Sequence, residues 1–410
     1  MFFGTIKSAS DSSSVEYADI YLSGKTIGTI SNSGGEFEIK IPDSLAIDDL
    51  LISSVGYKTK SIALKKKSLG TIYLEPQTMI LKEVVVTANR VDSSFNILKL
   101  ATQFIKYNYP RKNHLIEGFF RATSIRDTIC TRLIEAAIRV QEGNYTKDAW
   151  DDENLEMVKN RVKVVEIRKS DDKRKTDFFL KALTMLLGER NDLYQTLGSN
   201  YVRLIGKKGN HIMSMNNLAK YNSELLGKIE LDGNTVYVIT FTDHRDTHFQ
   251  WSEINLFVNV SDFAIVRVEL QTMYNPNRKE IAEDRMIESK YIFKSEVSYR
   301  KINHKYYPVY IHSIGPDGNA SHTVELGEKK QTQFAEKLFL LTNVYENDFS
   351  KIKWKDAEKR DKDLYGKDDP YNEKFWENYN MVKLNPLKRS TKELEKNSTL
   401  TQQFKKGKEK

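Results

Sequence analysis

The stretch Gly28-Thr29-Ile30-Ser31-Asn32-Ser33-Gly34-Gly35-Glu36-Phe37-Glu38-Ile39 decides how the first part of the chain folds. From Glu36 to Ile41, apolar side chains alternate with charged ones, which is the period of a strand with one face in water. The residues from Asn32 to Gly35 tolerate the positive φ angles of a tight turn. The pattern therefore predicts a strand, a turn and a second strand, forming a β-hairpin over residues 28–41.

Short strand-like runs continue on both sides of this hairpin. They cover residues 4–7, 15–22, 50–57, 58–64 and 70–74. About seven short strands, with turns every 8–12 residues, are typical of a small β-sandwich. We therefore predict a seven-stranded β-sandwich domain over residues 1–80.

Several spaced motifs in this region resemble one family. The motifs are Gly4-Thr5-Ile6, Ala18-Asp19-Ile20-Tyr21-Leu22, Gly28-Thr29, Gly34-Gly35-Glu36-Phe37, Val55-Gly56-Tyr57 and Leu81-Lys82-Glu83-Val84-Val85-Val86-Thr87. Together they are similar to the carboxypeptidase regulatory-like (transthyretin-like) domain of Bacteroidetes envelope proteins. Family members usually carry Asp before the hairpin glycine, where this chain has Asn32, and the difference affects turn chemistry more than fold. The resemblance implies a non-catalytic interaction or spacer module in the cell envelope.

Residues 81–94 are predicted to be a linker to a larger α+β domain over residues 95–350. The regulatory-like domain also precedes the plug and barrel of many TonB-dependent receptors. The rest of this sequence lacks the long arrays of roughly ten-residue alternating strands that such a barrel needs. Apolar residues at helical spacing predict helices at 95–107 and 178–187.

The longest regular pattern is a meander of alternating strands. Runs at 225–231 and 235–242 flank the turn Asp232-Gly233, and runs at 251–260 and 264–273 flank the turn Ser261-Asp262. Asp-Gly between such runs is a strong hairpin signal. Further strands are predicted at 118–126, 131–141, 161–168, 289–300, 306–314 and 334–344. We expect a large antiparallel, curved sheet over the two helices, so that the fold as a whole is mainly β.

A second resemblance covers part of this meander. Residues 233–270 are similar in pattern to the strand pairs of LolA-like lipoprotein-carrier and lipoprotein-sorting folds. With Asn108-Tyr109-Pro110 before it and Phe375-Trp376-Glu377-Asn378-Tyr379-Asn380 after it, the arrangement also resembles uncharacterised Bacteroidetes proteins that share the N-terminal module. Residues 351–410 are rich in charge, and we expect a charged C-terminal extension that is partly disordered.

Composition excludes several classes of protein. The net charge of +8 is mild for 410 residues, and much of the excess lies in the tail at 388–410, so no nucleic-acid partner is expected. Cys130 is the single cysteine, which rules out an intramolecular disulfide. No run of about 18 apolar residues predicts a transmembrane helix. No signal peptide is visible, and because the chain starts inside a β-module we expect a longer natural N-terminus.

Two pairs of residues have the spacing of a zinc site. His114 and Glu117, and again His322 and Glu325, match the His-x-x-Glu spacing of zinc carboxypeptidases. Such a site also needs a third ligand, a general-base Glu and an α/β scaffold. Neither pair lies in an alternating β/α sequence, so a zinc peptidase is not expected.

Three further groups have the composition of a chemical site. Asp243-His244-Arg245-Asp246-Thr247-His248 is the densest set of potential metal ligands, but its loop position leaves the geometry undefined. Asp151-Asp152-Glu153 is interpreted as a solvated loop. Cys130 lies in a strand-like run and is interpreted as a packed small residue. We therefore predict no catalytic, cofactor-binding or metal-binding residues.

The sequence as a whole predicts a non-enzymatic binding or interaction protein of the cell envelope, in the periplasm or associated with the outer membrane. The location assumes an export signal that is missing from this chain. The partner would be an envelope protein, a glycan or a lipid. Two alternatives stay open: a lipid or lipoprotein carrier with an apolar cavity in its curved sheet, and a hydrolase whose site leaves no local motif. An unfilled apolar concave face would favour the carrier.

Overall fold

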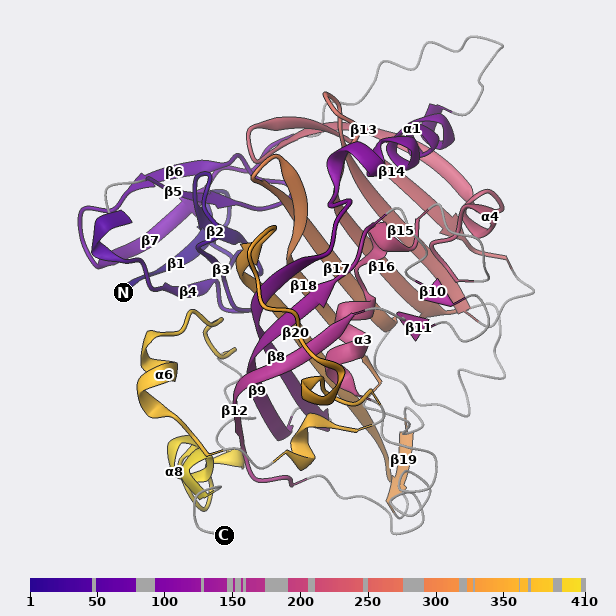
Figure 1. The fold of residues 1–410 in the computed structure, drawn as a ribbon. Helices are drawn as coiled ribbons and strands as arrows, with labels where there is room; N and C mark the ends of the chain where they lie inside the picture. The colour runs from indigo at the N-terminus through magenta and orange to yellow at the C-terminus, as the bar shows by residue number, and fades with distance from the viewer. Residues whose placement is uncertain are drawn as a thin grey trace.

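The computed structural model in Figure 1 is mainly β, with a small N-terminal domain lying against a large antiparallel sheet. It describes residues 1–45, 49–78, 93–126, 129–145, 150–151, 156–157, 160–173, 191–205, 211–245, 250–275, 291–316, 323–326, 329–360, 362–367, 370–385 and 393–406. The predicted fold class is therefore confirmed.

The N-terminal domain consists of two small sheets with an apolar core between them. Their orders are β4-β1-β7 and β3-β2-β5-β6. The strands are β1 (Phe2–Ser8), β2 (Asp19–Leu22), β3 (Gly28–Ile30), β4 (Glu36–Ile39), β5 (Asp49–Ser53), β6 (Lys60–Ala63) and β7 (Ser68–Leu74). Ile6, Ile20, Phe37 and Ile52 from both sheets are almost completely buried in this core. The predicted β-sandwich is therefore confirmed.

The predicted hairpin over residues 28–41 is wrong in its pairing. β3 pairs with β2 and β4 pairs with β1, so the intervening turn carries the chain from one sheet to the other. The turn forms as expected, with Oδ1 of Asn32 accepting the amide hydrogen of Glu36. A Cβ on Gly35, whose φ is +74°, would lie 2.3 Å from the carbonyl oxygen of Ile6. The alternation of apolar and polar residues predicts that β3 and β4 each turn an apolar face toward the core. It does not predict which neighbouring strand each of them pairs with.

The large sheet is antiparallel and has the order β12-β9-β8-β20-β18-β17-β16-β15-β14-β13, with β19 paired to β20. Its strands are β8 (His114–Arg126), β9 (Ile129–Glu142), β12 (Arg161–Lys169), β13 (Asn222–Leu231), β14 (Asn234–Asp243), β15 (Gln250–Asn259), β16 (Ile265–Tyr274), β17 (Tyr291–Ile302), β18 (Lys305–Pro316), β19 (Thr323–Leu326) and β20 (Lys329–Tyr345). The two-residue strands β10 (Trp150–Asp151) and β11 (Glu156–Met157) pair separately. The meander from β13 to β18 forms as the sequence predicts.

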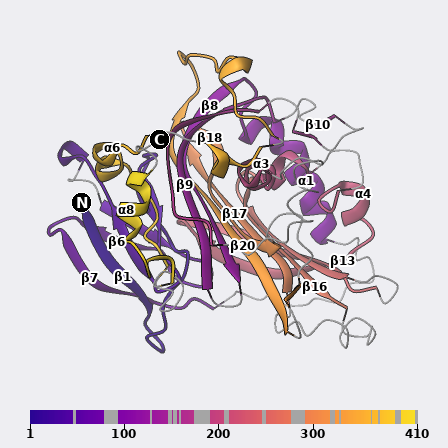
Figure 2. The ribbon, with the colours of Figure 1, turned by 90° about the horizontal axis from the view of Figure 1, so that it is seen from below.

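The curved sheet has helices on its concave face and the N-terminal domain on its convex face, as Figure 2 shows. The helices are α1 (Ser93–Asn108), α3 (Asp192–Gly198) and α4 (Met215–Leu218). α1 confirms the predicted helix at 95–107, whereas the predicted helix at 178–187 lies outside the described residues. None of the helices described is both long and apolar enough to cross a membrane.

The C-terminal part of the chain returns to the convex side, beside the N-terminal domain (Figures 1 and 2). It contains α6 (Glu373–Asn378) and α8 (Leu400–Lys405). Trp376 of α6 is 1% exposed and packs edge-on against Phe119 of β8, with 6.4 Å between the ring centroids. This buried aromatic side chain therefore anchors the segment to the sheet.

Candidate functional site

The convex face of the sheet carries a row of mostly charged side chains that crosses seven neighbouring strands, with one leucine among them. Directly paired residues along this row are Glu269, Glu296, His312, Leu338, Arg121, Glu135 and Arg168. Side chains of directly paired residues point to the same face of a sheet. The N-terminal domain and the C-terminal segment lie over this face, so the charges of the row need partners to offset the cost of burial.

One end of the row is a closed ion cluster beneath the C-terminal segment. Glu135 is completely buried and accepts hydrogen bonds from Nε of Arg121 at 2.6 Å and Nε of Arg168 at 2.5 Å. Nη2 of Arg121 also donates to the carbonyl oxygen of Val382 at 2.5 Å. Burial opposes ionisation of Glu135, but the two guanidinium groups outweigh burial and lower its pKa. This arrangement stabilises the packing of the C-terminal segment.

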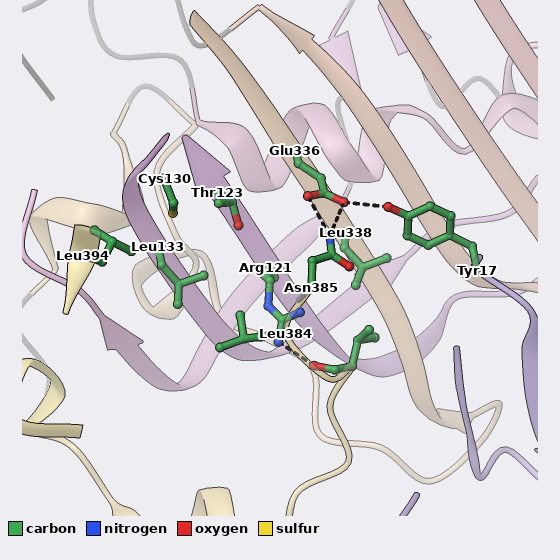
Figure 3. Close-up of a pocket in the computed structure, with 11 residues that line it drawn as sticks. Tyr17, Arg121, Thr123, Cys130, Leu133, Glu336, Leu338, Leu384, Asn385 and Leu394 are labelled. Atoms are coloured by element: carbon green, nitrogen blue, oxygen red, sulfur yellow. Dashed lines mark hydrogen bonds between the residues drawn. The ribbon is translucent and has the colours of Figure 1, made fainter. Parts of the chain in front are cut away.

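The middle of the row contacts the N-terminal domain through a stacked pair of rings. Tyr17 stacks on His312 with 4.2 Å between centroids, and both lie 3.0 Å from Oε1 of Glu336 through Oη and Nε2 respectively. Figure 3 shows Tyr17 and Asn385 converging on this carboxylate from opposite parts of the chain. The hollow beside them has a volume of about 30 Å³. It has room for water but not for a larger ligand.

A larger cavity, which we call the junction pocket, lies between the two domains. Its volume is about 260 Å³. One wall comes from β2, the turn after it and β5, and the other comes from the ends of strands in the large sheet. The lining residues are Tyr21, Ser23, Gly24, Leu51, Leu231, Asp232, Asn234, Asn259, Ser261, Asp262, Val266, Tyr299, Arg300, Lys301 and Tyr306.

Arg300 joins the two walls of the junction pocket. Its Nη1 donates to Oδ2 of Asp19 at 2.9 Å, and its guanidinium carbon lies 4.0 Å from the centroid of the Tyr21 ring. The hydroxyl of Tyr21 donates to Oδ1 of Asp232 at 3.0 Å. Nε of Arg300 is buried and has no hydrogen-bond partner among the described residues. Arg300 therefore links the N-terminal domain to the large sheet at one side of the pocket.

Burial raises the pKa of Asp19 to about 6, although Arg300 acts in the opposite direction. Burial also raises the pKa of Tyr21, and the nearby Asp232 carboxylate raises it further. The Tyr21 hydroxyl therefore keeps its proton at neutral pH and acts as a hydrogen-bond donor.

A second group of polar side chains lies around Asp262. Its Oδ2 accepts a hydrogen bond from the hydroxyl of Tyr306 at 3.1 Å and lies 3.2 Å from Nζ of Lys301. Nδ2 of Asn259 donates to the Tyr306 hydroxyl oxygen at 3.2 Å. Burial, and then the Asp262 carboxylate, raise the pKa of Tyr306. The pocket therefore combines carboxylate acceptors, cationic donors and neutral phenols.

The meander explains why these residues meet. The connections from β13 to β14, from β15 to β16 and from β17 to β18 lie at the same end of the strands, because successive hairpin turns of a meander alternate between the two ends. Asp232 and Gly233 in the first connection have φ of 51° and 70°, which are the angles of a type I′ turn. Asp262 and Lys301 lie at the next two connections. The sequence interpretation treated Asp232 and Asp262 only as turn residues and therefore missed the site.

The structure separates the members of the first His-x-x-Glu pair. Nε2 of His114 lies 3.2 Å from Glu142, whereas Glu117 lies 2.7 Å from Nε of Arg139. Residues three apart in a strand point to opposite faces of the sheet, so His114 and Glu117 cannot share a ligand. His322 of the second pair lies outside the described residues.

The remaining sequence candidates have structural contacts where they are described. Asp243 forms two hydrogen bonds with Arg245, at 2.6 and 2.8 Å, and His244 stacks on Trp251. Cys130 is 2% exposed, and burial raises the pKa of its thiol to about 12. Residues 246–248 and 152–153 lie outside the described part. Within that part, no three His, Cys, Asp or Glu residues are grouped so that they could hold a metal ion.

Comparison with known families identifies the N-terminal domain. Residues 2–86 match the model of the CarboxypepD_reg-like domain. The match confirms that the motifs of this region belong to a carboxypeptidase regulatory-like domain. No curated protein matches the chain.

Solved structures with low similarity include two bacterial proteins. A LolA superfamily protein from Nitrosomonas europaea is 11% identical, with a TM-score of 0.23, and the match covers 63% of this chain and 94% of that one. A DUF1329 family protein from Desulfovibrio piger is also 11% identical, with a TM-score of 0.27, and covers 64% of this chain and 95% of its own. We draw no argument from likenesses with such low TM-scores.

Proposed function

We propose that this protein is a non-enzymatic binding protein of the cell envelope, which holds a small polar ligand in the junction pocket. The observation that carries the proposal is the pocket itself, a cavity of about 260 Å³ with one wall from each domain. Ligand sites occur preferentially at domain interfaces, where polar groups from separate units converge. The regulatory-like domain then acts as one half of a binding site as well as an interaction module.

The chemistry of the pocket supports binding rather than catalysis. A general acid or base works best when its pKa lies near the operating pH. Burial raises the pKa of Tyr21 and Tyr306 away from neutrality, and Lys301 is paired with Asp262. Asp19 has a pKa of about 6, but it pairs with Arg300 behind the pocket lining. These groups are suited to holding a ligand in a fixed orientation.

The envelope location is part of the proposal, in the periplasm or at the outer membrane. It is supported by the CarboxypepD_reg-like domain at residues 2–86, because the motifs of that domain resemble those of envelope proteins. Fractionation of the native host cells, followed by immunoblotting, tests it. We expect the protein in the periplasmic or outer-membrane fraction, and recovery in the cytoplasm alone would contradict the location.

Native mass spectrometry of the protein incubated with a small-molecule extract of the cell envelope tests the binding function. We expect the wild-type protein to gain a defined mass and the pocket variant Ser23→Trp to lose it. Ser23 is exposed at the pocket, so the indole can enter the cavity without disturbing a buried core. Ser44→Trp, at an exposed position of the same domain, is the matched control and should retain the added mass. Equal binding by both variants would contradict a function of this pocket.

A second candidate function is that of a lipid or lipoprotein carrier, which would use the concave face of the sheet after its helices move away. This face is apolar, and side chains of α1 and α3 pack in the same core. Its buried residues include Ile116, Phe120, Ile134, Ile138, Ile239, Phe241, Ile254 and Leu256. A carrier would have to move these helices to admit an acyl chain. An acyl-containing adduct that persists in Ser23→Trp would favour the carrier over the junction pocket.

A further inference from the structure

The segment that follows β20 places a tryptophan ring at the surface. Trp354 begins the short 3-10 turn η3 (Trp354–Asp356) and is 65% exposed. It is more exposed than any other large apolar residue in the described part of the chain. A single exposed ring does not define a site. The support and the charges around Trp354 therefore decide what this surface can bind.

The edge of the large sheet holds Trp354 in this outward position. Ile352 is buried, and its amide donates to Oε1 of Gln141 in β9 at 2.9 Å. Nη1 of Arg161 in β12 donates to the carbonyl oxygen of Ile352 at 2.7 Å. The guanidinium carbon of Arg161 lies 4.4 Å from the centroid of the Trp354 ring. The indole therefore has an ordered backbone beneath it and a cation against it.

A groove lies beside this segment and has a volume of about 680 Å³. One wall is formed by residues 111–113, which follow α1, and the other includes residues 346–349 and Lys351, which follow β20. Arg111, Lys112 and Lys351 are exposed along the groove. Tyr107, which is 57% exposed, lies four residues before Arg111. The groove and Trp354 therefore belong to one surface that combines aromatic rings with cations.

Basic side chains outnumber acidic ones on this surface, which we call the cationic face. Its basic residues are Arg111, Lys112, Arg161, Lys351, Lys353 and Lys355, and its acidic residues are Glu346, Asp348 and Asp356. Lys351, Lys353 and Lys355 are exposed, and none of them forms an ion pair with a described residue. Glu346 accepts a hydrogen bond from the hydroxyl of Tyr307 at 2.9 Å. The excess positive charge is therefore available to an anionic partner.

The combination of an exposed indole with unpaired lysines fits a lipid surface. Tryptophan is enriched where a membrane meets water, because its ring is apolar and its N–H is polar. Lysine stems can lie along apolar groups while their ammonium groups reach lipid phosphates. Anionic lipids also attract basic segments. A folded acidic protein would need a broad complementary face, of about 800 Å² on each partner, whereas η3 offers one ring on one short turn.

We propose that the cationic face binds the surface of a membrane that contains anionic phospholipids, with the Trp354 ring at the level of the headgroups. Lys351, Lys353 and Lys355 contact the lipid phosphates around it. The groove and the junction pocket share no lining residue. This inference is therefore independent of ligand binding in the junction pocket and adds a second partner.

Co-sedimentation of the full chain with lipid vesicles tests the proposal. The probes are vesicles of phosphatidylcholine alone and of phosphatidylcholine mixed with phosphatidylglycerol. We expect binding to the mixed vesicles and much weaker binding to the neutral ones. Raising the salt from about 0.1 M to about 1 M should release the protein, because screening shortens the reach of the lysine charges. Tryptophan emission of the wild-type protein should shift to shorter wavelength when mixed vesicles are added.

Two variants of the cationic face separate the contributions of charge and ring. Lys353→Gln combined with Lys355→Gln should weaken binding about 5-fold for each lysine removed. Trp354→Ala should weaken binding and abolish the emission shift, although other tryptophans remain in the chain. The charge-matched control is Lys65→Gln combined with Lys67→Gln, in an exposed basic run of the N-terminal domain. Tyr73→Ala, at a 44% exposed ring, is the control for the loss of an aromatic side chain.

All of these positions except Tyr73 lie at lysines or a ring with little buried surface, so the variants should unfold at the wild-type temperature. Loss of binding in the cationic-face variants, together with wild-type binding in both controls, supports the proposal. The proposal is wrong if mixed vesicles do not bind, if neutral vesicles bind equally well, or if only the controls lose binding. None of these failures affects the adduct expected in the junction pocket, which Ser23→Trp tests separately.

Discussion

Replacement of Glu135 by Gln is expected to destabilise the protein strongly, because Glu135 is the shared partner of two buried arginines. Its side chain has no exposed surface, and the side chains of Arg121 and Arg168 are 10% and 12% exposed. Gln keeps the volume of the side chain and one acceptor oxygen but removes the negative charge. Two guanidinium groups then remain close together beneath the C-terminal segment without a counter-charge.

The expected loss follows from the burial of this cluster. Breaking a buried ion pair by removing one partner costs about 3–5 kcal/mol, because the remaining charge stays buried. We therefore expect Glu135→Gln to lower the free energy of unfolding by about 3–5 kcal/mol, a large fraction of the 5–15 kcal/mol typical of native proteins. Urea titration followed by tryptophan fluorescence measures this loss. Trp376 is a local reporter, since its ring lies 4.5 Å from the guanidinium carbon of Arg168.

Glu117→Gln is the matched control on the same two strands and the same face of the sheet. Glu117 of β8 accepts a hydrogen bond from Arg139 of β9 at 2.7 Å, but these side chains are 21% and 49% exposed. Surface pairs of this kind contribute about 0–1 kcal/mol. Equal losses in the two variants, or a loss below about 1 kcal/mol for Glu135→Gln, would refute the reasoning that burial under the C-terminal segment sets the strength of the pair.

Three further predictions concern other parts of the structure. The side chain of Asn380 accepts a hydrogen bond from the amide of Lys40 at 2.7 Å and donates one to the carbonyl oxygen of Lys40 at 2.9 Å. Asn380→Ala should therefore lower the free energy of unfolding by about 1–3 kcal/mol and speed hydrogen exchange of the Lys40 amide. Asn378→Ala, at an exposed position, is the control and should do neither. Burial opposes ionisation of Glu142, but its arginine and histidine partners lower its pKa to about 2. The ionised Glu142 side chain therefore stabilises the folded protein above the ordinary pKa of 4.5, and this contribution is lost as pH falls toward 2. Urea titrations across this range should show a weaker pH dependence for Glu142→Gln, and identical slopes would contradict the assignment. The buried thiol of Cys130 should react with Ellman's reagent only after unfolding, and rapid labelling of the native protein would argue against its placement.

Local patterns predicted the elements of the fold well where each element depends on its own sequence. The spacing of apolar residues placed α1, and the alternation around Asp232-Gly233 and Ser261-Asp262 placed the meander. The pairing of β3 and β4 was predicted wrongly, because their apolar faces would fit the same core in a hairpin or in two facing sheets. The predicted helix at 178–187 stays a prediction.

The candidate site was not predictable in the same way. Tyr21 lies 211 positions before Asp232 in the sequence, yet their side chains form a hydrogen bond across the domain junction. Asp19 and Arg300 are 281 positions apart and form an ion pair there. No local spacing encodes such contacts, because they depend on how one domain packs on the other.

The sequence by itself determined the type of the N-terminal domain, the antiparallel meander and helix α1, which lies on the concave face of the sheet. Each of these follows from local periodicity, turn chemistry or a set of spaced motifs. Only the tertiary structure decided which charges are buried. Glu135 and Glu117 are the same residue type, but the rest of the chain covers the side chain of Glu135 completely and leaves that of Glu117 partly exposed. It also decided that hairpin turns of the large sheet meet β2 of the N-terminal domain at a pocket. Burial and convergence arise from long-range packing, which a pattern along the chain does not record.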